Sequence, residues 1–236
     1  MSSIKRTARQ AGLLYLVMGV PAVFSLQYFP RAFIVSGNAA ATAQRITDGA
    51  LTYRFLVLSE LVTYVGFLFL VWALYHLFEE VDKRVAMLMV ILVSVSAAIG
   101  MVNIINTMAP LVLLSGADFL SVFTKPQLDA LALSFLRLRN GGINVNTAFW
   151  GLWLFPFGVL VIKSGFVPKI LGIFLIVGCF AYLAVCLTAM VLPAHVRVAN
   201  QIALPFFALA ELPIWIWLLK GPSVEPSEAQ RAGAGR

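Results

Sequence analysis

Two glutamates of this sequence, Glu60 and Glu211, lie within long apolar stretches. An ionised carboxylate surrounded by hydrocarbon is costly unless it is paired with a cation or faces water. A glutamate in such a place could bind a polar ligand or act as a general acid or base. Tyr64, four residues after Glu60, could donate a hydrogen bond to it. A positive charge could come from Arg54, Arg137, Arg139 or His195.

Three asparagines share this apolar context: Asn103, Asn106 and Asn144. At a rise of about 1.5 Å per helical residue, we expect them to lie at a depth similar to that of Glu60. Asn103 and Asn106 are three residues apart, so they share one face of a helix. The simpler interpretation is that such amides join neighbouring helices, where a hydrogen bond contributes about 0.6 kcal/mol.

Two arginines, Arg137 and Arg139, precede Asn144, and we interpret them as the rim of an outward-facing pocket. Guanidinium groups bind carboxylates and phosphates through paired hydrogen bonds. The alternative is that both arginines anchor the chain at lipid phosphates. The predicted ligand-binding set is therefore Glu60, Tyr64, Asn103, Asn106, Arg137, Arg139, Asn144 and Glu211.

The cysteines and histidines do not have the spacing of a metal site. Cys179 and Cys186 are seven residues apart on one predicted helix, about 10 Å along its axis, which is too far for a disulfide. His76 and His195 fall near opposite faces of the predicted membrane protein. We therefore predict no metal and no cofactor. Because no nucleophile or phosphate-binding loop is recognisable either, an enzyme is the less favoured class.

The composition places these residues in a membrane protein. The chain has 236 residues, of which 61% are hydrophobic and 11% are charged, whereas soluble domains carry about 25% charged residues. Several apolar stretches reach or approach the roughly 20 residues that a helix needs to cross a bilayer. They lack the alternation of apolar and polar residues that is typical of membrane β-strands. We predict an all-α integral membrane protein, a six-transmembrane-helix bundle with spans at residues 10–29, 52–78, 85–114, 143–162, 168–192 and 199–219.

Two short helices are predicted between these spans, both at the outer membrane interface. The first covers residues 39–48, with Asn38 as its N-cap and Gly49 at its end. The second is amphipathic and covers residues 126–140, where Gly141-Gly142 is expected to stop it. Pro30 is expected to help end the first spanning helix.

The charges predict how the chain lies in the membrane. The net charge of +7 comes from Lys and Arg at predicted helix ends, which favours headgroup contacts over nucleic acid. Ten of these residues fall on one side and seven on the other, so we expect both termini on the cytoplasmic side of the membrane. Residues 1–220 are predicted to form one transmembrane domain, and residues 221–236 a disordered tail.

Several stretches together resemble one family of bacterial multi-pass membrane proteins, the domain-of-unknown-function family 4386. Its most specific parts here are Trp-Gly-Leu-Trp-Leu-Phe-Pro at residues 150–156 and Lys-Ser-Gly-Phe-Val-Pro at residues 163–168. Further parts lie at residues 9–16, 37–43, 72–75 and 217–221 and at Glu211. The resemblance implies a six-helix membrane protein of bacteria, located in the inner (plasma) membrane, and it implies no catalytic residue or substrate.

Three functions stay open at this point. The first is the binding or movement of a small polar or anionic ligand in an outward-facing intramembrane pocket. The second is a membrane enzyme that acts on a lipid-like substrate, with Glu60 or Glu211 as acid or base. The third is a structural or regulatory partner of another membrane protein, docked through residues 126–140. The expected partners are the lipid bilayer and such a ligand; the oligomeric state is left open.

Overall fold

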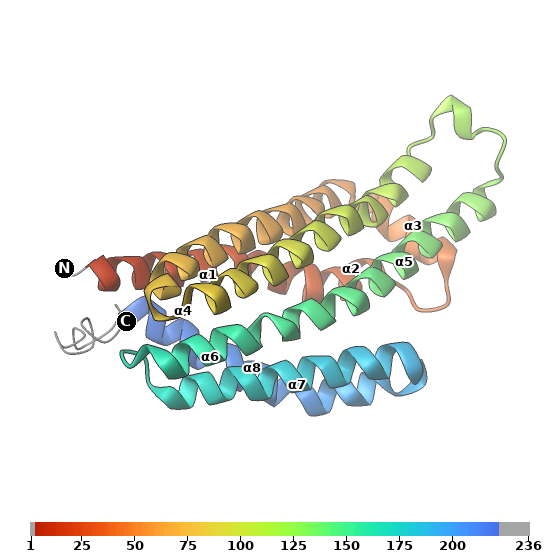
Figure 1. Cartoon of the computed structure of the whole chain (residues 1–236). Coiled ribbons are helices and arrows are strands. Elements are labelled where there is room, and N and C mark those ends of the chain that lie inside the picture. Colours follow the sequence, from red (N-terminus) through yellow and green to blue (C-terminus); the bar gives the residue numbers. More distant parts are fainter. Residues whose placement is uncertain (1–2, 222–236) are drawn as a thin grey trace. The chain divides into compact units, whose positions relative to one another are not determined.

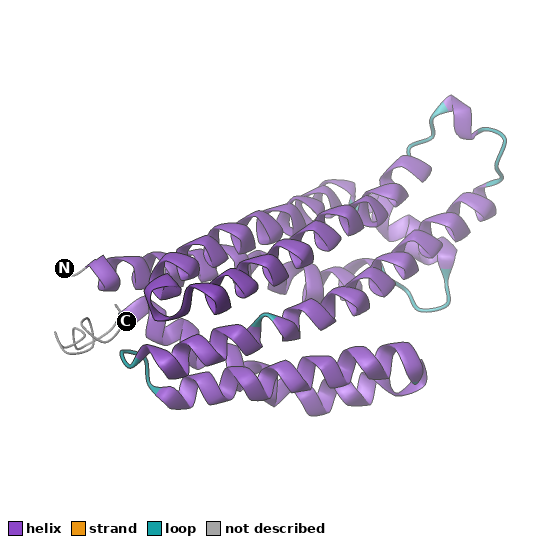
Figure 2. Ribbon diagram, viewed as in Figure 1, coloured by secondary structure: helices purple, strands orange, loops and turns teal. Residues whose placement is uncertain are grey.

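A computed structural model describes residues 3–221 of the chain. Within this range the chain is helical and contains no strand, as Figures 1 and 2 show. The predicted disordered tail, apart from Gly221, lies outside the described residues. Five helical stretches are long and apolar enough to cross a membrane: Ile4–Phe33, Ala50–Leu113, Lys125–Ser164, Lys169–Val191 and Pro193–Lys220. The protein is therefore an all-α, multi-pass membrane protein.

The described chain divides into two compact units. The first unit comprises residues 3–16, 66–97 and 144–221, and the second comprises residues 17–65 and 98–143. Several long helices pass from one unit into the other, because the boundaries at residues 16, 65, 97 and 143 fall inside helices. That residues 1–220 form one domain stays a prediction.

The longest helix, α4 (Ala50–Leu113), includes two of the predicted spans. It is interrupted at Asp82, whose backbone angles (φ −161°, ψ 97°) are not helical, and the chain reverses its direction there (Figure 1). The Asp82 carboxylate accepts a hydrogen bond from the Val85 N–H at 3.2 Å, as an N-cap residue does. It also contacts Lys163 Nζ at 2.8 Å, and this hydrogen bond lowers the pKa of the Asp82 carboxyl group.

The first span differs from its prediction. Helix α1 (Ser3–Val23) continues into a π-helical turn, η1 (Phe24–Tyr28), and then into α2 (Phe29–Phe33). Pro30 was expected to end the span, and this prediction is wrong. Proline lies here in the first turn of α2, where a helix does not use the backbone N–H groups, so the helix continues to Phe33.

The short helix predicted at residues 39–48 is present as α3 (Ala39–Asp48). Asn38 Oδ1 accepts a hydrogen bond from the Ala41 N–H at 2.9 Å, and the Gly49 N–H donates to the Arg45 carbonyl at 3.0 Å. Both caps are therefore the predicted ones. Its location at the membrane interface stays a prediction.

The second predicted short helix is not separate from the span that follows. Helix α5 (Lys125–Leu152) runs without a stop through Gly141-Gly142, and α6 (Leu154–Ser164) follows it directly. The predicted end at residue 140 is wrong because neither glycine adopts the positive φ that ends a helix. Gly142 instead lets α5 approach α4, since a Cβ atom there would lie 2.3 Å from Asn103 Oδ1.

In the first unit, α6 packs against α7 (Lys169–Val191), and α7 packs against α8 (Val196–Lys220). The short 3₁₀ turn η3 (Pro193–His195) precedes α8. A second 3₁₀ turn, η2 (Asp118–Leu120), belongs to the second unit and lies between α4 and α5 in the sequence. The backbones of α6 and α7 approach closely at Gly158 and Gly172, as small residues allow in membrane bundles.

Candidate functional site: a buried arginine–glutamate cluster

The second unit encloses an ion pair between Arg139 of α5 and Glu60 of α4. Arg139 is 1% exposed and Glu60 is 6% exposed, so both charges are removed from solvent. Arg139 Nε donates to Glu60 Oε1 at 2.9 Å, and Nη2 contacts the same oxygen. A cationic partner was one of the possibilities considered for Glu60, and in the structure Arg139 is that partner.

Thr107 of α4 completes the coordination of the carboxylate. Its hydroxyl donates to Glu60 Oε2 at 2.8 Å and accepts from Arg139 Nε at 3.2 Å. The guanidinium carbon also lies 4.4 Å from the centre of the Phe29 ring, a cation–π contact. Both oxygens of Glu60 and one face of Arg139 therefore have partners inside the unit.

The π-helical turn provides a further acceptor for the arginine. Arg139 Nη2 donates to the Ser25 carbonyl at 3.0 Å. This carbonyl is free of helical partners because the Phe29 N–H, its usual α-helical donor, bonds to the Phe24 carbonyl instead. The donor five residues on would be Pro30, which has no N–H. Such π turns occur frequently at functional sites.

Aromatic side chains form the wall of the cluster beside the arginine. Tyr53 is fully buried, donates to the Thr107 carbonyl at 2.7 Å, and lies 5.2 Å from the Phe29 ring and 5.1 Å from the Phe33 ring. Together with Ile46, Leu56 and Leu136 they make a buried hydrophobic core. The ion pair is thus buried beside a hydrophobic core, where its Coulomb attraction is screened less than in bulk water.

The two asparagines of α4 are joined to the same cluster. Asn103 Nδ2 donates to the Arg139 carbonyl at 2.9 Å, and Asn106 Nδ2 donates to Asn103 Oδ1 at 2.9 Å. The bond from Asn103 connects α4 to α5, which is the simpler role considered for such amides, and the bond from Asn106 holds the Asn103 side chain within α4. Of the predicted set, Glu60, Asn103, Asn106 and Arg139 come together.

The two arginines predicted as a rim have different positions. Arg139 is at the centre of the cluster, so its interpretation as a rim residue is wrong, whereas Arg137 is exposed. The reason is the helical period: Ala132, Leu136 and Arg139 fall on one buried stripe of α5, and Arg137 falls off it. Tyr64 is buried with its ring against Gly100, where an added Cβ would lie 2.0 Å from the ring.

Four cluster members were not predicted: Ser25, Phe29, Tyr53 and Thr107. One signal in the sequence points to one of them: Thr107 follows Asn103 by four residues and so shares its helix face. In an α-helix Pro30 would remove the donor of the Leu26 carbonyl, so it does not point to Ser25. The two aromatic residues have no comparable signal, since the chain carries 18 phenylalanines and 6 tyrosines.

Glu211 belongs to the first unit, where it has its own partners. Tyr15 donates to Glu211 Oε2 at 2.9 Å, and Tyr182 donates to Oε1 at 2.6 Å. His195, considered as a partner for these glutamates, is exposed. The two glutamates therefore occur in different clusters, one bound to an arginine and one to two tyrosine hydroxyls.

Asn144 also belongs to the first unit and is half-buried. Two residues later, Asn146 of α5 exchanges two hydrogen bonds with Ser96 of α4, at 2.8 and 3.1 Å. Within the described range, no three His, Cys, Asp or Glu side chains gather as a metal-binding group.

Comparison with known proteins gives one family. Residues 10–221 match the family described as Domain of unknown function (DUF4386). No significant match was found among curated proteins or among solved structures.

Proposed function

We propose that this chain, which belongs to the family described as Domain of unknown function (DUF4386), binds a small anionic ligand within the membrane at Arg139. In this proposal Glu60 occupies the anion's place while the site is closed. The observation that supports it is the ion pair itself: a guanidinium 1% exposed, neutralised by a carboxylate 79 residues away in the sequence.

A purely structural role explains this pair less well. Replacing a buried ion pair by apolar residues of similar size is often neutral or stabilising, so burying two charges is an inefficient way to hold helices together. The Asn103 amide already joins α4 to the Arg139 carbonyl without any charge. Ionisable residues inside membranes most often belong to ligand or ion pathways.

The chemistry of the cluster suits an exchange of anions. A guanidinium has five N–H donors in a planar fork that fits either a carboxylate or a phosphate. If an external anion takes the place of Glu60, the glutamate must leave Arg139, so the anion and the Glu60 carboxylate compete for one guanidinium.

We also propose that the chain spans the membrane six times, with α4 providing two spans separated at Asp82 and both termini on the cytoplasmic side. The support is the reversal at Asp82 and the Lys and Arg bias of the short turns. Single cysteines at Lys83 and Arg45, in a background with Cys179 and Cys186 replaced by alanine, test it. A membrane-impermeant maleimide should label the Arg45 position in intact cells and the Lys83 position only after lysis; the reverse pattern excludes this orientation.

The ligand proposal is tested by thermal unfolding of purified protein in detergent with phosphate, sulfate, acetate or lactate at constant ionic strength. We expect at least one anion to raise the unfolding temperature of the wild type and of Arg137→Gln, because binding to the folded state stabilises it. The same anion should have no effect on the double variant Glu60→Gln/Arg139→Gln, in which the cluster stays neutral. Equal stabilisation of the double variant would contradict binding at Arg139.

A further inference from the structure

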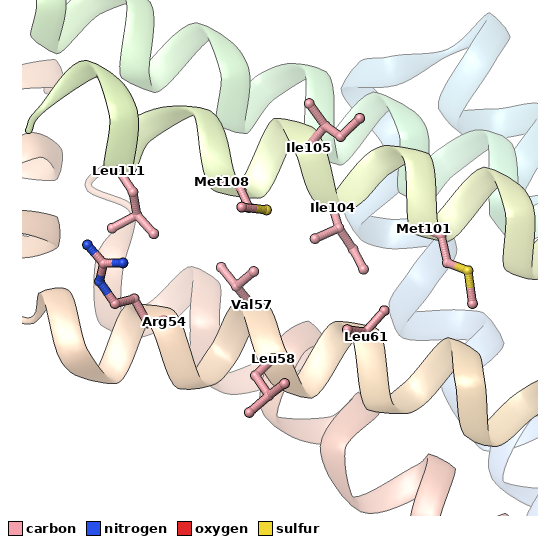
Figure 3. Close-up of a pocket in the computed structure, with 9 residues that line it drawn as sticks. All are labelled: Arg54, Val57, Leu58, Leu61, Met101, Ile104, Ile105, Met108 and Leu111. Carbon is pink, nitrogen blue, oxygen red and sulfur yellow. The ribbon is translucent and has the colours of Figure 1, made fainter.

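A groove lies between two stretches of α4 in the second unit, separate from the buried ion pair. Its volume is about 430 Å³, and Figure 3 shows the nine residues that line it. Eight of them are apolar, and Arg54 is the exception. The lining residues are Arg54, Val57, Leu58, Leu61, Met101, Ile104, Ile105, Met108 and Leu111.

The charge is placed at one end of the groove. Figure 3 shows Arg54 and Leu111 at that end, and Leu61 and Met101 at the opposite end. The Arg54 side chain is exposed, and within residues 3–221 it forms no ion pair. Arg54 was considered as a partner of Glu60, but both oxygens of that carboxylate are bound to Arg139 and Thr107. The guanidinium is therefore available to an external anion.

We propose that this groove binds an anionic phospholipid, with one acyl chain along the apolar wall and the phosphate on Arg54. The residues from Arg54 to Leu61 cover about 10 Å of helix, so the wall can contact a substantial part of an acyl chain. Met101 and Met108 have flexible side chains, which adapt to a chain that has no fixed shape. A guanidinium binds phosphate through two parallel hydrogen bonds.

The charge at one end distinguishes this groove from ordinary lipid contact. Many apolar side chains of a membrane protein touch acyl chains, and such contact does not select a headgroup. An unpaired guanidinium selects a headgroup with net negative charge over a zwitterionic one, because the zwitterion carries its own cation beside the phosphate. The proposal therefore predicts selectivity, which can be measured independently of the anion site at Arg139.

The test is native mass spectrometry of delipidated protein in detergent, titrated with dioleoyl phosphatidylglycerol or with dioleoyl phosphatidylcholine. We expect the wild type to retain one phosphatidylglycerol at about tenfold lower lipid concentration than phosphatidylcholine. Arg54→Gln should remove this preference, and Arg54→Lys should keep part of it. Arg31→Gln, which changes another exposed arginine outside the groove lining, is the matched control and should behave as the wild type.

A second variant tests the apolar part. Ile105→Trp places a large ring at an exposed position of the groove wall and should weaken retention of both lipids. Only variants that elute as one symmetric species in size-exclusion chromatography are compared, and Arg54 and Ile105 are exposed, so their replacement should leave the fold intact. Equal retention of the two lipids by the wild type, or an unchanged preference in Arg54→Gln, would overturn the proposal.

Discussion

Replacing Arg139 by glutamine is expected to lower the free energy of unfolding by about 3–5 kcal/mol. The substitution leaves the Glu60 carboxylate buried without its cation. It also removes the donor of the Ser25 carbonyl, which has no helical donor of its own. The loss should show as unfolding at lower denaturant concentration, followed by far-ultraviolet circular dichroism in micelles.

A double-mutant cycle separates the pair from the other contacts of Arg139. Glu60→Gln combined with Arg139→Gln removes both charges, so the double variant should recover a large part of the stability that Arg139→Gln loses. Arg137→Gln is the matched control: the residue is exposed on the same helix, and its change should stay within about 0.5 kcal/mol. If Arg139→Gln lowers the free energy of unfolding no more than Arg137→Gln does, Arg139 does not form the buried ion pair with Glu60.

Two neighbouring glycines of α5 are expected to respond to alanine with opposite signs. Gly141→Ala should stabilise the protein by up to about 1 kcal/mol, because alanine favours a helix and, apart from adjacent residues and the surrounding helix backbone, no atom lies within 4 Å of the added methyl group. Gly142→Ala should destabilise it by about 1–3 kcal/mol, because the methyl group would meet the Asn103 side chain at 2.3–2.8 Å. Asn103 would have to leave its bond with the Arg139 carbonyl.

The same denaturation experiment measures both glycine variants. A further variant, Asn103→Ala, gives a check on the cause. Once the amide is absent, Gly142→Ala should cost much less than it does in the wild type, because the space that it needs is free. Stabilisation of equal size by Gly141→Ala and Gly142→Ala would show that helix propensity, and not contact with Asn103, decides the effect.

Composition and helix caps were sufficient to predict the class of fold and the helix at residues 39–48. These features depend on local interactions: apolar length for the membrane, and the side chain of Asn38 for the start of α3. The glycine pair misled the prediction because a glycine can end a helix or let two helices approach, and only the neighbouring chain decides which. Here the neighbour is Asn103.

The candidate site was predicted in part. Glu60 and the two asparagines of α4 could be recognised because polar residues in apolar stretches are conspicuous. Arg139 and Arg137 differ by two positions in the sequence, and their roles separate only when the buried stripe of Ala132 and Leu136 is followed into α5. The Ser25 carbonyl can bind Arg139 because the chain forms a π turn there, in which the Phe29 N–H bonds to the Phe24 carbonyl. Sequence periodicity alone does not reveal such a turn.

The central claim is that Glu60 and an external anion compete for Arg139. It is tested most directly by the affinity of Glu60→Gln for the anion that stabilises the wild type, measured by isothermal titration calorimetry at pH 7. In the wild type the ligand must displace a bound carboxylate, which lowers its apparent affinity. Removing that competitor should tighten binding at least about tenfold. Binding that is unchanged or weaker in Glu60→Gln would contradict the claim.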